Sequence, residues 1–296
     1  MIEDYAVEPD CFRSPDALRY LFEKFGFHHG RFIVAYPSGW LSKIRNELSS
    51  LPDGQRKRAI EYLAKYRDDR IVERKIDFDP TRDWANNAAI AKQHREIDKA
   101  ICGKSNAHGI TTYDEIDESF FLPAESGRTV ANVKNYSSAI QRLLQISREV
   151  ILVDPYFQFS RPGRTKVLSA FLSEAMRTPC KSFVLFCRHS IATNAGGDKF
   201  RQLAQQFCSR HLFHDQKLTV NLLDDEGRPN AMHARYIFSR KGGIAFDKGF
   251  QEEPVETYVD LALIAPKLLD DLCKLYLDGN HGHTVVASYT WKGSNS

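Results

Sequence analysis

Apolar residues recur at helical spacing through much of the first half of the chain, which predicts amphipathic helices. The first helix begins at Ser14 and Pro15, two residue types that favour a helix start, and ends at Gly26. Asp83 is of the type that caps a helix, and we expect the helix that it begins to continue to about Ile101. The remaining elements expected here are helices over residues 40–48 and 55–66 and strands over residues 31–37 and 71–78.

Helical periodicity alternates regularly with short apolar runs from Val130 onward. The run Glu149–Val153 is apolar on both faces, which is typical of a buried strand in a parallel sheet. Similar patterns predict strands near residues 182–186, 218–222, 235–239, 243–246 and 257–264, and helices near residues 136–146, 167–176, 199–213 and 266–277. Helices that alternate with apolar strands indicate an α/β fold with a mixed sheet flanked by helices.

The change of pattern divides the chain into two predicted domains. Residues 1–125 contain helices and strands in no regular alternation, which predicts a smaller α+β domain of unknown role. Residues 130–296 form the predicted α/β domain. The segment 105–128 has turn residues and weak periodicity, so we interpret it as the connection between them.

Composition limits the class of protein. Hydrophobic residues make up 42% of the chain and charged residues 27%, which is ordinary globular usage. The net charge of +3 excludes a strongly basic surface, so any nucleic-acid site must be a local patch. The six cysteines form no C-x-x-C pair, which indicates reduced thiols rather than disulfides or zinc ligands, and we expect no metal and no cofactor. The acidic first ten residues and the lack of a long apolar run predict no signal peptide, no transmembrane segment and a cytoplasmic protein.

Polar residues follow the predicted strands at the edge of the sheet where α/β proteins bind ligands. Asp154 and Tyr156 follow the first strong strand, and Arg188 ends the second. His233 and Arg235 alternate, so on a strand both side chains would point to one face. An arginine grips two oxygens of a phosphate, and an imidazole can attack or hydrogen-bond it, so this pair predicts a phosphate site.

The order of helices and strands in the second domain, with a His-x-basic motif before a strand that contains glycine, is similar to one lobe of the phospholipase D superfamily. Four short motifs carry a narrower match. They are Asp154-Pro155-Tyr156, Pro179-Cys180-Lys181, His233-x-Arg235 and Gly243…Asp247-x-Gly249-Phe250. More narrowly, residues 130–280 resemble the phospholipase-D-like C-terminal domain of MIT-domain proteins and its bacterial relatives, which are thought to serve in antiviral defence. The resemblance leaves the first 125 residues without an assignment.

Active enzymes of that superfamily use a nucleophilic histidine, a lysine two residues later and an aspartate five residues after the lysine. Two such sets meet at one site, from two repeats or two subunits. In this chain Arg235 replaces the lysine and Arg240 replaces the aspartate that would orient His233. Only one good motif is present, so hydrolysis would require a homodimer. The resemblance therefore implies a site that favours phosphate binding over cleavage.

The candidate residues have assigned roles under this hypothesis. His233 and Arg235 would contact the phosphate, and Arg240 would add positive potential at the rim of the pocket. Asp154, Tyr156, Arg188 and Asp247 would complete the ligand site, with Asp154 or Asp247 able to replace the missing aspartate in space. The structural alternative is that His233 bonds a nearby carbonyl and that Arg235 pairs with Asp154 or Asp247.

Three functional hypotheses follow from these observations. The first is a phosphate-binding module for nucleic acid or an anionic head group, within a defence system. The second is a dimeric, metal-independent phosphodiesterase or nuclease that uses His233. The third is a protein-interaction subunit of a larger complex.

Overall fold

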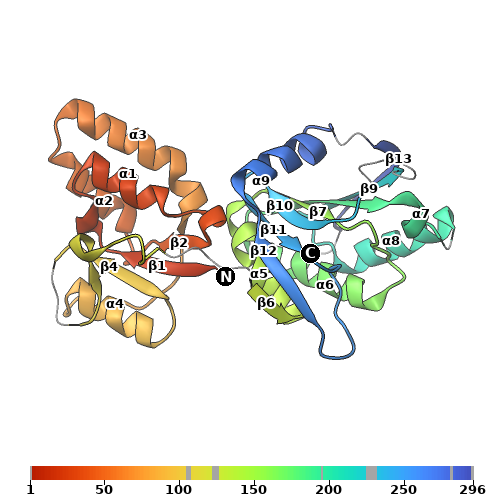
Figure 1. Cartoon of the computed structure of the whole chain (residues 1–296), viewed down its shortest axis with the longest axis horizontal. Helices are drawn as coiled ribbons and strands as arrows, with labels where there is room; N and C mark the ends of the chain where they lie inside the picture. The colour runs from red at the N-terminus through yellow and green to blue at the C-terminus, as the bar shows by residue number, and fades with distance from the viewer. Residues whose placement is uncertain are drawn as a thin grey trace. The chain divides into compact units, whose positions relative to one another are not determined.

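The structure is a computed structural model that describes residues 2–104, 108–121, 127–194, 196–224, 232–280 and 283–294. The chain divides into two compact units, Met1–Ala124 and Glu125–Ser296 (Figure 1). Each unit has its own sheet, so each is described by itself. Within the described ranges, no helix is both long and apolar enough to cross a bilayer.

The first unit is built on a five-stranded parallel sheet with the strand order β3-β2-β1-β4-β5. The strands are β1 (Glu3–Val7), β2 (Arg31–Val34), β3 (Ile71–Val72), β4 (Lys99–Cys102) and β5 (Thr111–Thr112). The helices are α1 (Pro15–Glu23), α2 (Trp40–Ser49), α3 (Asp53–Arg70) and α4 (Trp84–Gln93), with short 3₁₀ turns at Pro9–Phe12, Phe27–His29 and Tyr113–Glu115. An aromatic core that includes Tyr5, Phe12 and Trp40 fills the space between the sheet and α1, α2 and α3.

The predicted helix starts of this unit are confirmed. The hydroxyl of Ser14 accepts a hydrogen bond from the backbone N–H of Ala17 at 3.1 Å, and the carboxylate of Asp83 accepts one from Asn86 at 2.7 Å. A side chain that caps a helix in this way satisfies a backbone donor that the helix itself cannot pair. Ser14 and Asp83 therefore mark the starts of α1 and α4, as the sequence predicted.

The α+β prediction for the first unit is wrong, because all of its strand pairs are parallel and it belongs to the α/β class. The sequence pattern missed β1, β4 and β5, and β5 lies in the segment that was interpreted as the connection between the domains. The helix that begins after Asp83 ends at Gln93 rather than near Ile101, since Arg95 has a positive φ of 59° that no helix continues. The apolar run that follows then forms the buried strand β4.

The second unit is built on an eight-stranded mixed sheet with the order β13-β9-β8-β7-β10-β11-β12-β6. The strands are β6 (Gly127–Val130), β7 (Glu149–Val153), β8 (Ser182–Arg188), β9 (Lys217–Asp224), β10 (Arg235–Ser239), β11 (Gly242–Phe246), β12 (Tyr258–Leu263) and β13 (Thr284–Lys292). The helices are α5 (Val133–Ile146), α6 (Pro162–Glu174), α7 (His189–Ala192), α8 (Gly197–His211) and α9 (Pro266–Leu272), with a 3₁₀ turn at Ala175–Arg177 and a π-helical turn at Cys273–Leu277.

Helices cover both faces of this sheet, which confirms the predicted mixed sheet flanked by helices. Strands β9, β8 and β7 are adjacent and parallel, and β10 runs antiparallel beside β7. Helices α5 and α6 pack together on one side, and α9 covers the other side over a core that includes Ile151, Phe238 and Leu272. The predicted strand Glu149–Val153 coincides with β7, whereas β6 and β13 at the two edges were missed.

Candidate functional site

Three strands bring the candidate residues to one edge of the second sheet. Strand β7 ends immediately before Asp154, and its parallel neighbour β8 ends at Arg188. Strand β10 runs antiparallel to β7, with Tyr236 opposite Val153, so its first residue, Arg235, lies at the same edge. The carboxyl edge of the parallel strands is where ligands bind in α/β sheets.

Tyr156 contacts two guanidinium groups at this edge. The Cζ atom of Arg235 lies 4.9 Å from the centre of the Tyr156 ring, and that of Arg188 lies 5.6 Å from it. Both distances are within the range of a cation–π interaction. The structure therefore brings together Tyr156, Arg188 and Arg235, as the sequence predicted.

Backbone carbonyls hold the two arginines in place. The Nη2 atom of Arg188 donates to the carbonyl of Met232 at 2.8 Å, and the Nη1 atom of Arg235 donates to the carbonyl of Asp247 at 3.2 Å. The Nε atom of Arg235 is buried and has no hydrogen-bond partner. A neutral carbonyl accepts a hydrogen bond without cancelling the charge of the guanidinium, so these two bonds orient the arginines at this edge of the sheet.

His233 lies before β10 rather than on it, because the strand begins at Arg235. Its side chain is exposed, and its neighbour Met232, which Arg188 bonds, is buried. In the part of the chain that the structure describes, no hydrogen bond joins the imidazole of His233 to a carbonyl or a carboxylate. The expectation that His233 and Arg235 share one face of a strand is therefore wrong, although both lie at the same edge of the sheet.

Asp154 lies beneath the arginines and has no exposed surface, so the prediction that it touches a ligand is wrong for this conformation. Its Oδ1 atom accepts a hydrogen bond from the backbone N–H of Tyr156 at 3.0 Å, and its Oδ2 atom is buried without a partner. Burial raises the pKa of Asp154, against the opposing effects of Arg164, the Tyr156 N–H and Arg235. Asp154 can therefore act on a ligand only through its neighbours.

Asp247 contributes its backbone to the site and not its carboxylate. The Asp247 carbonyl accepts the hydrogen bond from Arg235, whereas its Oδ1 atom accepts one from the backbone N–H of Asp260 at 3.0 Å. The carboxylate thus joins β12 to the end of β11. Neither Asp247 nor Asp154 replaces the missing aspartate by hydrogen bonding to His233.

Arg240 lies at the opposite end of β10, so its predicted place at the pocket rim is wrong. Four residues lie between it and Arg235, and the strand from Arg235 to Ser239 alone spans about 13 Å at about 3.3 Å per residue. Its Nη2 atom instead donates to the carboxylate of Asp278 at 2.7 Å, and this pair is exposed. Because it is distant and already paired, Arg240 makes a suitable control for the site.

Arg164 belongs to the site, and the sequence analysis missed it. It is the third residue of α6, which begins at Pro162, whereas the periodicity predicted a helix only from Val167. The Nε atom of Arg164 donates to the side-chain oxygen of Gln251 at 3.0 Å. Proline at the first position of a helix was the signal that would have placed Arg164 in the first turn.

Gly249 closes the site over these buried charges. A Cβ atom at this position would lie 3.1 Å from Oδ2 of Asp154 and 3.7 Å from Nη2 of Arg164. The backbone can approach the two side chains this closely because glycine has no side chain. The site therefore contains three guanidiniums, from Arg164, Arg188 and Arg235, around one buried carboxylate.

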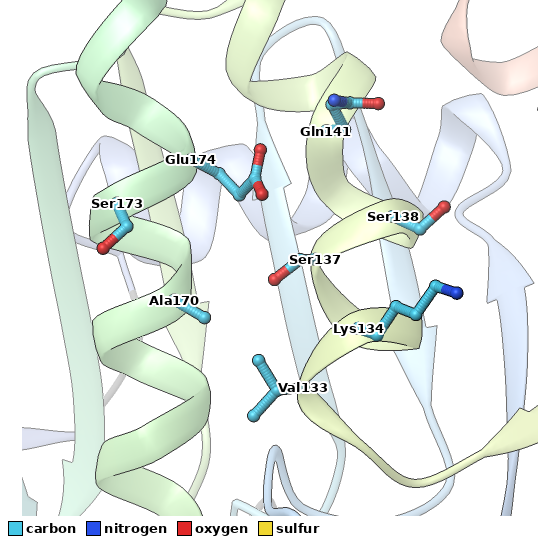
Figure 2. A pocket seen from close by; sticks show the side chains of 8 residues that line it. All are labelled: Val133, Lys134, Ser137, Ser138, Gln141, Ala170, Ser173 and Glu174. Atoms are coloured by element: carbon cyan, nitrogen blue, oxygen red, sulfur yellow. The ribbon is translucent and has the colours of Figure 1, made fainter.

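A separate groove between α5 and α6 contains none of the candidate residues. The side chains of Ser137 and Glu174 point into the gap between the two helices (Figure 2). Its lining comes from α5 and α6 alone and includes small residues such as Ala170, so it lies where these two helices pack together. Among the described residues, no group of three or more histidine, cysteine, aspartate or glutamate side chains is arranged to hold a metal ion.

Comparison with known proteins assigns no family to this chain. No family model matches it, and neither does any curated protein. Among solved structures, it is similar to the archaeal chromatin protein TrmBL2, whose structure is described as showing a novel mode of DNA binding. That match has 11% identity and a TM-score of 0.30, and covers 92% of this chain and 81% of the other. A likeness this weak supports no conclusion about fold or function.

Proposed function

We propose that the unit Glu125–Ser296 is a phospholipase-D-like module that binds a phosphodiester group and does not cleave it. The observation that supports this most is the placement of Arg188 and Arg235 on one tyrosine ring at the carboxyl edge of the sheet. Backbone carbonyls and an aromatic ring orient both guanidiniums at one edge of the sheet. They therefore suit the negative oxygens of a nucleic acid or an anionic lipid head group.

Binding is favoured over hydrolysis by the surroundings of His233. A nucleophilic histidine needs a partner that orients the ring and supports its positive form. In the described residues, no carboxylate bonds the imidazole of His233, and Arg240 occupies the sequence position of the missing aspartate at the far end of β10. His233 then donates a hydrogen bond to the bound phosphate.

A salt titration tests this proposal on the full chain. Labelled single-stranded DNA, single-stranded RNA and vesicles containing an acidic phospholipid are offered at 50 to 500 mM salt. We expect at least one of them to bind, with an affinity that falls steeply as salt rises, because counterions compete for the arginines. A chromogenic phosphodiester should remain uncleaved in the same buffer without metal.

Two outcomes would support other functions. Metal-independent cleavage that is lost in His233→Ala, by a protein that is a dimer in solution, would establish the alternative of a phosphodiesterase or nuclease. Absence of salt-dependent binding to all three probes would favour the alternative of a protein-interaction subunit. A cytoplasmic role in prokaryotic antiviral defence is a further part of the proposal, and it rests on the family resemblance alone.

A further inference from the structure

Asp154 occupies the centre of the site although no solvent or ligand can reach it directly. Its Oδ2 atom is buried without a hydrogen-bond partner, and so is the Nε atom of Arg235. Buried polar atoms are almost always paired in folded proteins. Two unpaired atoms of opposite charge in one small site therefore indicate a role other than stabilising the fold.

The charges around Asp154 indicate what that role is. Burial lowers the pKa of the partly buried Arg164; the charge of Asp154 opposes this effect, whereas the charge of Arg235 adds to it. The two guanidiniums thus repel each other, and the carboxylate of Asp154 attracts both. The carboxylate of Asp154 therefore opposes the repulsion between the two guanidiniums.

We propose that Asp154 is a positioning residue whose buried carboxylate orients the guanidiniums of Arg164 and Arg235, which lie on either side of it against Gly249 and Tyr156, so that both bind the same phosphate group. The inference rests on the proposed function and adds Arg164 to the residues that contact the ligand. Tyr156 links this cluster to Arg188. Its backbone N–H donates to Asp154, and its ring contacts the guanidiniums of Arg188 and Arg235. A phosphodiester with two oxygens in one plane suits such a pair of forked donors.

The central experiment combines Asp154→Asn with Arg235→Gln in the full chain. Asparagine keeps the acceptor for the Tyr156 N–H and removes the charge. The probe is a labelled single-stranded 12-mer of DNA, whose phosphodiesters keep their charge across the working pH range. We expect Asp154→Asn to weaken binding at least tenfold, although it makes the site more positive. In a protein that already carries Arg235→Gln, Asp154→Asn should change the affinity for DNA less than twofold, because the guanidinium that Asp154 positions is absent.

A spectroscopic measurement separates positioning from a general structural effect. In nitrogen–proton NMR spectra of arginine side chains, the Nε–H signals of Arg164 and Arg235, assigned with the Gln variants, should both shift in Asp154→Asn and on adding DNA. If Asp154→Asn does not fold, Gly249→Ala decides the question, because its Cβ atom would press on Oδ2 of Asp154 at 3.1 Å. We expect this variant to bind at least fivefold more weakly, and Gly197→Ala, which meets open space, to bind like the wild type.

The results distinguish this inference from the proposed function. The inference is overturned if Arg235→Gln weakens DNA binding but Asp154→Asn binds DNA as tightly as the wild type or more tightly. If Asp154→Asn does not fold, the same criterion applies to Gly249→Ala. Wild-type protein that does not bind DNA, or that binds equally with Arg235→Gln, would instead refute the proposed site.

Discussion

At the scale of residues, the ring of Tyr156 organises the positive charge of the site. Two guanidinium groups approach it, at 4.9 and 5.6 Å from the ring centre, although like charges repel. The negative face of an aromatic ring offsets that repulsion, and each such contact contributes about 0.5–2 kcal/mol depending on solvent exposure. The ring, rather than the phenolic hydroxyl, is therefore the part that supports the site.

Replacement of the Tyr156 ring tests this point. We expect Tyr156→Leu to weaken DNA binding about tenfold, because both arginines lose their stacking partner. Tyr156→Phe is the matched variant, since it keeps the ring, and should bind within twofold of the wild type. Fluorescence anisotropy at low salt measures both. Equal weakening in the two variants would show that the hydroxyl contacts the ligand.

The sequence predicted part of this site for a physical reason. Tyr156, Arg188 and Arg235 each lie at the end of a strand, and strand ends at one edge of a sheet meet whatever the loops do. The burial of Asp154 and the approach of Arg164 depend instead on how the segment near Gly249 packs on α6. Periodicity contains no information about such a contact between distant segments.

At the scale of elements, the β10–β11 hairpin fixes the position of Arg235. Arg235 pairs with Phe246 at the open end of the hairpin, and Ser239 pairs with Gly242 at the turn. At Gly243, a Cβ atom would lie 2.7 Å from Cδ1 of Ile264 and 2.9 Å from the carbonyl of Ile237. The Cβ atom of Phe238, which pairs with Gly243 across the hairpin, would lie closer still. Close packing within the hairpin and against Ile264 therefore requires glycine at this position.

We expect Gly243→Ala to destabilise the second unit by about 1–3 kcal/mol, the usual cost of forcing an extra methyl group into a packed core. Gly197→Ala at the start of α8 is the control, because a Cβ atom there meets nothing within 4 Å. Urea unfolding of the two variants measures the difference. A Gly243→Ala protein as stable as its control would mean that the hairpin packs less closely than described.

Other elements show where the pattern of apolar residues succeeds and fails. β7 is buried on both faces between two strands, so its sequence is strongly constrained and its bounds were predicted correctly. β13 lies at the edge of the sheet, and most of its residues are exposed. An edge strand that faces solvent needs no alternation of apolar and polar residues, and the prediction missed it for that reason.

At the scale of the whole molecule, the two units differ in how the sequence revealed them. The chain divides between Ala124 and Glu125, where the sequence pattern also changes. The first unit has a parallel sheet that short, non-alternating strands concealed, and no candidate residue lies in it. The second unit has the candidate site, and its local charge could be inferred although the net charge of the chain is only +3.

The phosphate site is tested most directly by comparing Arg235, the first residue of β10, with Arg240, which directly follows the last residue of β10. Arg235→Gln removes the guanidinium that contacts Tyr156. Arg240→Gln removes an exposed guanidinium that pairs with Asp278 and lies beyond the other end of β10. Both variants lose one positive charge, so a non-specific electrostatic effect would be equal. Binding of the labelled 12-mer over a salt series should be at least tenfold weaker for Arg235→Gln and unchanged for Arg240→Gln. Equal affinities of the two variants would contradict a phosphate site at the carboxyl edge of the sheet.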